Sequence, residues 1–478
     1  MAATATDIRS LMQANRTEPD SEAVAHVVTA TIFLAVAAIG AAVGLISMTF
    51  PFFVPLGYGI IRAITMLAAY VGFGAVAVIG GAYFVLPRLT GAPLWNERLA
   101  RLGLLLIVAS VVVGMIVVGV GLGDGSEALA LPWWIDLPLL VGLVIPALVA
   151  VNTVRHRSEG RSYVSVPYVV TALVALPLLY VVGNLPNLSS VAATVGDLFF
   201  SSSFLIAGVL LASIGLVYYA VVKQTDRPLA GRQLAQVGFW SLLFGAGWMG
   251  INQITSGPVP DWLAAVSSVL GLAFPAALVA TAANLVATVS RRPEGEWDPV
   301  VTTAVSGTLL GVGVATLTAI AGFRSASTLL AYTTFWEAIT YGLMLGVIPL
   351  LTASWMFHAL PRMTGRKLFS TELARRHVRL TLWGAGGLIL LLGLGGVVTG
   401  YSWAGGGFTG AFAAVGDGWA ASTTTGKIFV GLGIIPGLVA VAGDLTLASL
   451  LFRTLTRGQV TTQEVLVTHL ADEGPGDE

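Results

Sequence analysis

A short connector occurs three times in this chain, each time directly after a long apolar segment. The sequence LPRLTG at residues 86–91 returns as LPRMTG at residues 360–365, and a weaker copy reads VKQTD at residues 222–226. The threonines of the three copies lie 135 and 139 residues apart, and each is followed four residues later by a leucine (Leu94, Leu229 and Leu368). Solenoid repeats are roughly 20–50 residues long, whereas a repeat of about a third of a chain is typical of internally symmetric membrane folds.

The composition indicates that the chain crosses a membrane many times. Hydrophobic residues make up 56% of it and charged residues only 10%, with a mean hydropathy of +0.87. A membrane helix needs roughly 20 apolar residues, and twelve segments qualify: residues 24–50, 59–86, 101–123, 134–153, 166–185, 194–221, 233–255, 262–289, 300–322, 329–358, 377–400 and 426–453. Irregular backbone cannot face lipid, so these segments are predicted to be helices.

The connector follows the second, sixth and tenth of these segments. We therefore predict an all-α integral membrane protein whose twelve transmembrane helices form three pseudo-symmetric arcs of four. The predicted membrane domain covers residues 24–455, between a polar N-terminal tail at 1–23 and an acidic C-terminal tail at 456–478. The N-terminal tail has no apolar core and does not resemble a cleavable signal.

The distribution of basic residues predicts the orientation. All but three of the 24 Lys and Arg residues lie in the tails or in the connectors after even-numbered segments, the exceptions being Arg62, Arg324 and Lys427. Basic residues stay in the cytoplasm, so both termini are predicted to be cytoplasmic. The lipid bilayer is thus the first expected partner, and we expect the chain in a prokaryotic cell membrane.

Charge and cysteine content exclude several kinds of function. The net charge is zero and there is no basic stripe with interleaved aromatic residues, so nucleic acid is not an expected partner. The chain contains no cysteine, which excludes disulfides, thiolate metal sites and cysteine-ligated iron–sulfur clusters.

A family resemblance rests on the sixth and seventh segments. The run YYAVVKQTDRPL at residues 218–229, followed by Phe239-Trp240 and the sequence PDW at residues 260–262, resembles the catalytic subunit I of haem-copper respiratory oxidases, with the cbb-type cytochrome c oxidases as the most similar branch. The resemblance implies twelve helices in three arcs. It also implies two haems and a copper ion held by histidines on helices two, six, seven and ten.

This chain departs from the family pattern at every histidine position that the resemblance implies. The positions matching the haem and copper ligands are occupied by residues without an imidazole (Thr65, Ser202, Asn252, Gln253, Ile339 and Tyr341), and Ala246 matches the family's cross-linked tyrosine. Thr65, Ser202, Asn252 and Tyr341 all fall in the outer halves of their segments, so the matched positions are predicted to form one layer. The five histidines lie elsewhere, at segment ends, in a loop and in the tail (His26, His156, His358, His377 and His469).

Hydroxyl, amide and aliphatic side chains cannot replace imidazole as ligands of haem iron or copper. We therefore expect no haem, no copper and no catalysis by this chain alone. The favoured hypothesis is a non-redox subunit or scaffold of a respiratory membrane complex, in contact with other membrane or respiratory-chain subunits.

Two other hypotheses remain open from the sequence. The chain could be a divergent haem-containing terminal oxidase or nitric oxide reductase relative, with Met66, Met249 or Met344 or a Tyr341 phenolate as an atypical ligand. It could instead conduct protons or another ion, because Glu337 and Asp444 lie within apolar segments, where a charge costs at least about 2.5–3.5 kcal/mol. For both acids the simpler interpretation is a neutral or hydrogen-bonded group within the bundle.

Overall fold

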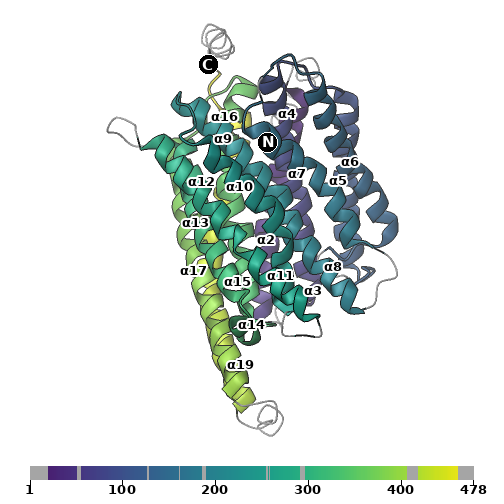
Figure 1. Cartoon of the computed structure of the whole chain (residues 1–478), viewed down its shortest axis with the longest axis vertical. Coiled ribbons are helices and arrows are strands. Elements are labelled where there is room, and N and C mark those ends of the chain that lie inside the picture. Colours follow the sequence, from purple (N-terminus) through teal and green to yellow (C-terminus); the bar gives the residue numbers. More distant parts are fainter. Residues whose placement is uncertain are drawn as a thin grey trace.

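The computed structural model is a bundle of long helices (Figure 1). It describes residues 20–50, 55–125, 129–160, 162–185, 190–254, 257, 259–290, 297–405 and 418–460. The predicted tails at residues 1–23 and 456–478 fall largely outside the described residues. In the part that is described, α2 begins at Ser21 and α19 ends at Arg457.

Eleven helical stretches in the described part of the chain are long and apolar enough to cross a membrane. Seven of them are single helices: α2 (Ser21–Thr49), α5 (Glu97–Gly119), α6 (Trp133–Arg155), α7 (Ser165–Gly183), α13 (Pro299–Ala321), α17 (Thr371–Gly405) and α19 (Gly418–Arg457). The others are the pair α11 (Asp261–Gly271) and α12 (Ala273–Val289) and three composite stretches described below. A short helix, α14 (Arg324–Leu330), precedes the last composite stretch.

The predicted seventh span is broken. Here α10 (Arg232–Gly245) gives way to a 3₁₀ segment, η4 (Ala246–Ile254), with a bend of 44°. Glycines at 245, 247 and 250 weaken the α-helix and admit neighbours, since a side chain at Gly250 would collide with the Leu198 backbone. The prediction of twelve spans holds for the described residues if this bent pair counts as one.

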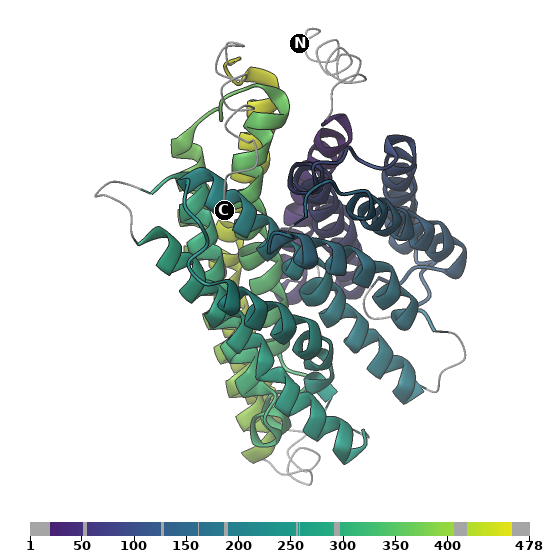
Figure 2. The same ribbon diagram turned by 45° about the horizontal axis from the view of Figure 1, so that its top comes forward.

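Three composite stretches form the centre of the bundle. They consist of α3–η2–α4 (Tyr58–Met66, Leu67–Ala75, Val76–Thr90), α8–η3–α9 (Ser190–Ser203, Phe204–Leu210, Leu211–Thr225) and α15–η5–α16 (Thr334–Gly342, Leu343–Val347, Ile348–Thr364). In their most apolar windows 94–100% of the residues are buried, against 39–56% in the other spans. Figure 2 shows the outer helices packed around them. The repeated connector therefore follows the three most buried spans.

Each central stretch is π-helical in its middle, at η2, η3 and η5. Glycines within these segments receive a side chain from another helix: Gly72 packs on Phe33, Gly208 on Leu176 and Gly346 on Leu310. The rings of Tyr70 and Phe204 stack between η2 and η3 with centroids 6.5 Å apart. π-Helical turns are uncommon and frequently occur at functional sites, so the middle layer of the bundle is where a site is expected.

The three connectors end their helices in the same way. Each places a residue in the left-handed conformation directly after the threonine: Gly91 and Gly365 at φ 63° and Asp226 at φ 50°. Glycine adopts this conformation without steric cost, which explains why two of the copies carry it. Each threonine hydroxyl donates to the carbonyl four residues earlier, at 2.7 Å.

The connectors are also fastened to a second helix by a repeated hydrogen bond. In each, the backbone N–H directly after the repeated leucine donates to a buried threonine hydroxyl near the end of a later helix: Trp95 to Thr153 at 3.1 Å, Ala230 to Thr288 at 3.0 Å and Phe369 to Thr454 at 3.2 Å. These threonines are at most 2% exposed. The bond therefore satisfies a loop N–H that would otherwise lie unpaired beside the helix ends.

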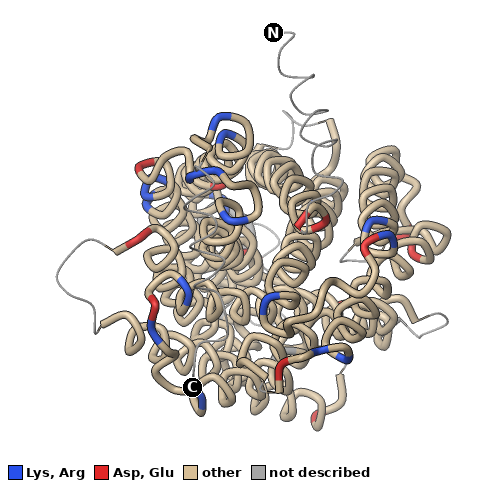
Figure 3. The backbone as a smooth tube through the Cα atoms, turned by 90° about the horizontal axis from the view of Figure 1, so that it is seen from above, with Lys and Arg blue, Asp and Glu red and all other residues tan. Residues whose placement is uncertain are grey.

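Both ends of the described chain lie beside these connectors. Arg88 donates to both carboxylate oxygens of Asp20, at 2.9 and 2.7 Å, and the Lys367 N–H donates to the Gln459 carbonyl at 2.9 Å. Seen from above, most positions in the bundle are uncharged and the charged ones are scattered among them (Figure 3). The described chain thus begins and ends on one side.

Replacing Thr153, Thr288 or Thr454 by valine should remove the hydrogen bond that fastens the connector to the second helix. We expect each change to destabilise the protein by about 0.5–1.5 kcal/mol, the usual net contribution of one hydrogen bond. Thermal unfolding in detergent measures this. The control is Thr316→Val, because the Thr316 hydroxyl is exposed and bonds only within its own helix. If the three threonine variants unfold at the same temperature as Thr316→Val, these hydrogen bonds do not have the stabilising role assigned to them.

Candidate functional site

A small cavity of about 50 Å³ lies in the middle layer of the bundle. Three of the predicted ligand positions line it: Ser202 from α8, Gln253 from η4 and Ile339 from α15. Ser202 donates to the Leu198 carbonyl at 2.9 Å and accepts from the Gly250 N–H at 3.1 Å. The structure therefore brings these three positions together from segments far apart in the sequence.

Two further positions, Thr65 and Tyr341, face α2 instead. Thr65 is 4% exposed and donates to the Ile61 carbonyl at 2.7 Å. A side-chain carbon at Gly40 of α2 would lie only 2.5 Å from the Thr65 hydroxyl oxygen, and one at Gly44 would lie 3.1 Å from the Tyr341 hydroxyl. Helix α2 is therefore packed directly against both positions.

Asn252 points away from the small cavity. The Ser267 hydroxyl on α11 donates to its side-chain oxygen, and the Ser327 hydroxyl donates to its backbone carbonyl at 3.2 Å. The amide packs against Gly322, where a side-chain carbon would lie 3.0 Å from Asn252 Cγ. Ala246 begins η4, and its side chain lies outside the described part of the structure.

The histidines of the described chain lie apart from this layer. His26, His358 and His377 are at most 1% exposed, and their Nδ1 atoms contact the Glu22 carbonyl, the Gln224 side-chain oxygen and the Gly443 carbonyl at 2.7–3.0 Å. His156 is exposed at the end of α6. None of these four lines the small cavity, and His469 falls outside the described residues.

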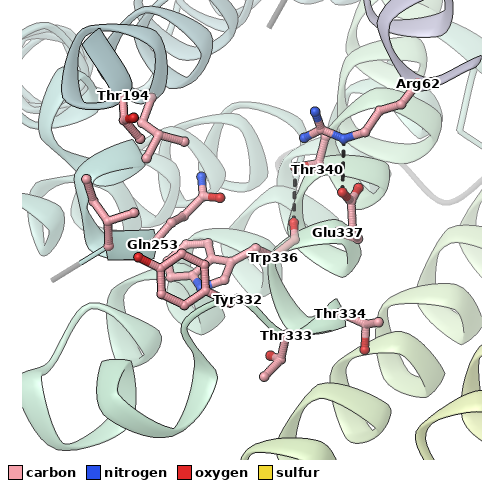
Figure 4. A pocket seen from close by; sticks show the side chains of 11 residues that line it. Arg62, Thr194, Gln253, Tyr332, Thr333, Thr334, Trp336, Glu337 and Thr340 are labelled. Atoms are coloured by element: carbon pink, nitrogen blue, oxygen red, sulfur yellow. Dashed lines mark hydrogen bonds and ion pairs between the residues drawn. The ribbon is translucent and has the colours of Figure 1, made fainter. Parts of the chain in front are cut away.

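A larger cleft of about 520 Å³ adjoins the small cavity and shares Gln253, Trp336 and Thr340 with it. Arg62 of α3 and Glu337 of α15 form an ion pair in its wall, with Arg62 Nε 3.0 Å from Glu337 Oε1 (Figure 4). Their side chains are 19% and 20% exposed. The two residues are 275 positions apart, so no local pattern in the sequence pairs them. The only available signal was that both lie near the starts of their spans, the second and the tenth.

Asp444 of α19 has very different surroundings. It is fully buried, and neither carboxylate oxygen has a hydrogen-bond partner among the described residues. Its neighbour in sequence, Gly443, packs against Thr381 of α17. The structure therefore places Glu337 in a polar cleft and Asp444 in a fully buried helix interface, and no hydrogen bond between the two is seen among the described residues.

The small cavity does not fit the metal groups implied by the family resemblance. Its lining at the predicted positions offers a serine hydroxyl, an amide and an aliphatic side chain, whereas haem iron and copper need stronger donors. A volume of about 50 Å³ holds one or two water molecules, while cofactor sites usually measure about 300–1,000 Å³. At the predicted ligand positions, neither the donor atoms nor the available space fits a haem or a copper ion.

Comparison with known proteins gives the family. The family described as Cytochrome C and Quinol oxidase polypeptide I matches residues 22–426. Cytochrome c oxidase subunit 1 of Rhodobacter capsulatus is 24% identical over 376 residues, covering 73% of this chain and 68% of that protein. The cbb3-type cytochrome c oxidase subunit CcoN1 of Stutzerimonas stutzeri is 24% identical over 368 residues, covering 72% and 76%.

A solved structure supports the fold. A haem-copper terminal oxidase, determined as a dimer by cryo-EM, matches with a TM-score of 0.72 at 12% identity, over 92% of this chain and 85% of the other. The chain therefore belongs to the cytochrome c and quinol oxidase polypeptide I family and is a multi-pass membrane protein with the haem-copper oxidase subunit I fold.

The Arg62–Glu337 pair can be tested by a double-mutant cycle. Arg62→Gln and Glu337→Gln should each destabilise the protein, because each leaves a half-buried charge without its partner. The double variant should recover part of the loss, with a coupling of about 0.5–3 kcal/mol between the two sites. Thermal unfolding of the four proteins provides the measurement. Strictly additive effects would show that the pair contributes nothing.

Proposed function

We propose that this chain is a non-redox member of its family, a membrane subunit or scaffold of a respiratory complex that binds neither haem nor copper. The observation that carries the proposal is the small cavity, where Ser202, Gln253 and Ile339 stand at predicted ligand positions around only about 50 Å³. Oxygen reduction needs a redox metal and a path for electrons, and these side chains can hold no metal of that kind.

The contacts of α2 support the same proposal at two further matched positions, Thr65 and Tyr341. Gly40 and Gly44 lie one helical turn apart and bring α2 against Thr65 and Tyr341. Close packing of this kind fills the space that a porphyrin plane would need, and an unfilled void of that size would be strongly destabilising. The interior would then be stable without a cofactor.

The proposal includes an arrangement and an orientation. Three connectors with the same hydrogen bond to a later helix, each following one of the three most buried spans, support twelve helices arranged as three pseudo-symmetric arcs of four. The basic residues near the connectors support cytoplasmic termini in a bacterial cell membrane. The named relatives are subunits of cytochrome c oxidases, so the proposed partners are other membrane subunits of a respiratory assembly.

The purified protein should lack a Soret band, and a pyridine haemochrome assay should find far less than one haem per chain. The control is the CcoN1 relative, expressed in the same cells and purified in the same way, which checks that haem is supplied. Stoichiometric haem in this chain, at the level of the control, would refute the non-redox proposal.

A haem-containing oxidase is the second candidate, because Met249 lines the small cavity and is 3% exposed. A thioether is a weak axial ligand, and methionine more often fills gaps between helices. If haem does bind through Met249, the haem spectrum should shift in Met249→Leu and stay unchanged in Met66→Leu, which changes a methionine outside the cavity lining.

Proton or ion conduction is the third candidate, and the buried Asp444 favours it because buried acids in membranes are frequently functional. In proteoliposomes, a flux through these acids should fall in Asp444→Asn and in Glu337→Gln. The matched control is Asp261→Asn, which removes an exposed acid at the start of α11. The non-redox scaffold hypothesis predicts no flux above that of empty liposomes in any of them.

A further inference from the structure

The large cleft is lined by a charged pair, two aromatic side chains and several hydroxyl groups that the scaffold role does not explain. We propose that it binds a small zwitterion, a molecule in which an ammonium group is joined to a phosphate or carboxylate. The inference goes beyond the proposed function and does not depend on whether haem is absent. Its volume of about 520 Å³ is within the range of about 300–1,000 Å³ that is usual for small-molecule sites.

The ion pair in the wall favours a ligand with two charges. Arg62 Nε and Glu337 Oε1 are only 3.0 Å apart, so an anion placed on Arg62 would also face the Glu337 carboxylate. A cation placed on Glu337 would likewise face the guanidinium. A zwitterion offers its acid group to Arg62 and its ammonium group to Glu337, and so meets an opposite charge at both ends. Arginine binds carboxylate and phosphate groups with well-defined geometry.

A hydrogen-bond donor in the same wall, without a partner among the described residues, favours a ligand that has an acid group. The indole Nε1–H of Trp336 has no hydrogen-bond partner among the described residues, although Trp336 is only 7% exposed. Indole can only donate, so it requires an acceptor oxygen. A buried donor left without one costs free energy, and a phosphate or carboxylate oxygen in the cleft would supply the acceptor.

The aromatic rings suit the ammonium end. Trp336 and Tyr332 both line the cleft, and Figure 4 shows their rings close to one another beside Gln253. Aromatic faces attract ammonium groups electrostatically. Tyr332 is 66% exposed and has φ 60°, a backbone conformation that non-glycine residues rarely adopt. Such conformations are frequent at binding sites, and here one holds an aromatic ring at the cleft.

Two sources could supply this chemistry, a soluble zwitterion or the headgroup of phosphatidylethanolamine. O-Phosphoethanolamine carries the same two groups and is the soluble probe. Calorimetric titration of the purified full-length protein should show saturable binding. Ethanolamine and inorganic phosphate, each offering one charge, should bind at least tenfold more weakly. The lipid source is tested in nanodiscs that contain both phosphatidylethanolamine and phosphatidylglycerol. The measurement is whether the protein purified from them retains phosphatidylethanolamine in preference to phosphatidylglycerol.

Variants decide whether the cleft is the site. Arg62→Gln and Glu337→Gln should each weaken binding at least tenfold, and Trp336→Phe should weaken it several-fold while retaining the ion pair and the aromatic ring. Asp261→Asn should bind like the wild type, because Asp261 is exposed and outside the cleft. Circular dichroism and thermal unfolding verify that each variant is folded.

The possible outcomes separate clearly. Saturable binding of the soluble probe, or retention of phosphatidylethanolamine, that is lost in the cleft variants supports the site and identifies its source. Absence of both would overturn the proposal, as would binding that is unchanged in Trp336→Phe and in either charge variant. Equal binding of inorganic phosphate and O-phosphoethanolamine would also overturn it, because the ammonium group would then have no role.

Discussion

Within a bilayer, every backbone N–H and C=O must find its partner inside the protein, and this requirement shapes the fold. The long helices satisfy most of their own groups. Where the three central helices end, a left-handed residue closes each helix and a threonine on another helix accepts the next unpaired loop N–H, as Thr153 does for Trp95. The three most buried spans are thus held at one end by the same device, and their middle layer is fixed relative to the outer helices.

That middle layer contains positions that match the metal ligands implied by the family resemblance, Ser202 and Ile339 among them. Here it is π-helical in all three central spans and is closed by side chains and by glycine contacts. At one point Ser202, Gln253 and Ile339 enclose a cavity of about 50 Å³, and at another α2 packs onto Thr65 and Tyr341. On the proposed function, the scaffold of the family is retained while its interior is repacked, and the larger polar space lies in the cleft beside Arg62.

Much of the fold could be predicted from the sequence, because long apolar segments and a repeated connector are local signals. The interruption after Gly245 and the π-helical segments could not, since they depend on how closely another helix approaches each glycine. For the site, the family resemblance identified Ser202, Gln253 and Ile339 from the sequence, and the structure shows that all three line one cavity. The turning of Asn252 toward Ser267 and the pairing of Arg62 with Glu337 were missed, because both are contacts between distant segments.

The central claim is that side chains and α2 occupy the space that haem would need. A cryo-EM map of the protein purified from its native membrane tests this most directly. The account predicts α2 in contact with Thr65 at Gly40, side-chain density around the small cavity and no planar density between α2, α3 and α15. Planar density of porphyrin size between these helices, with α2 moved away from Thr65, would contradict it.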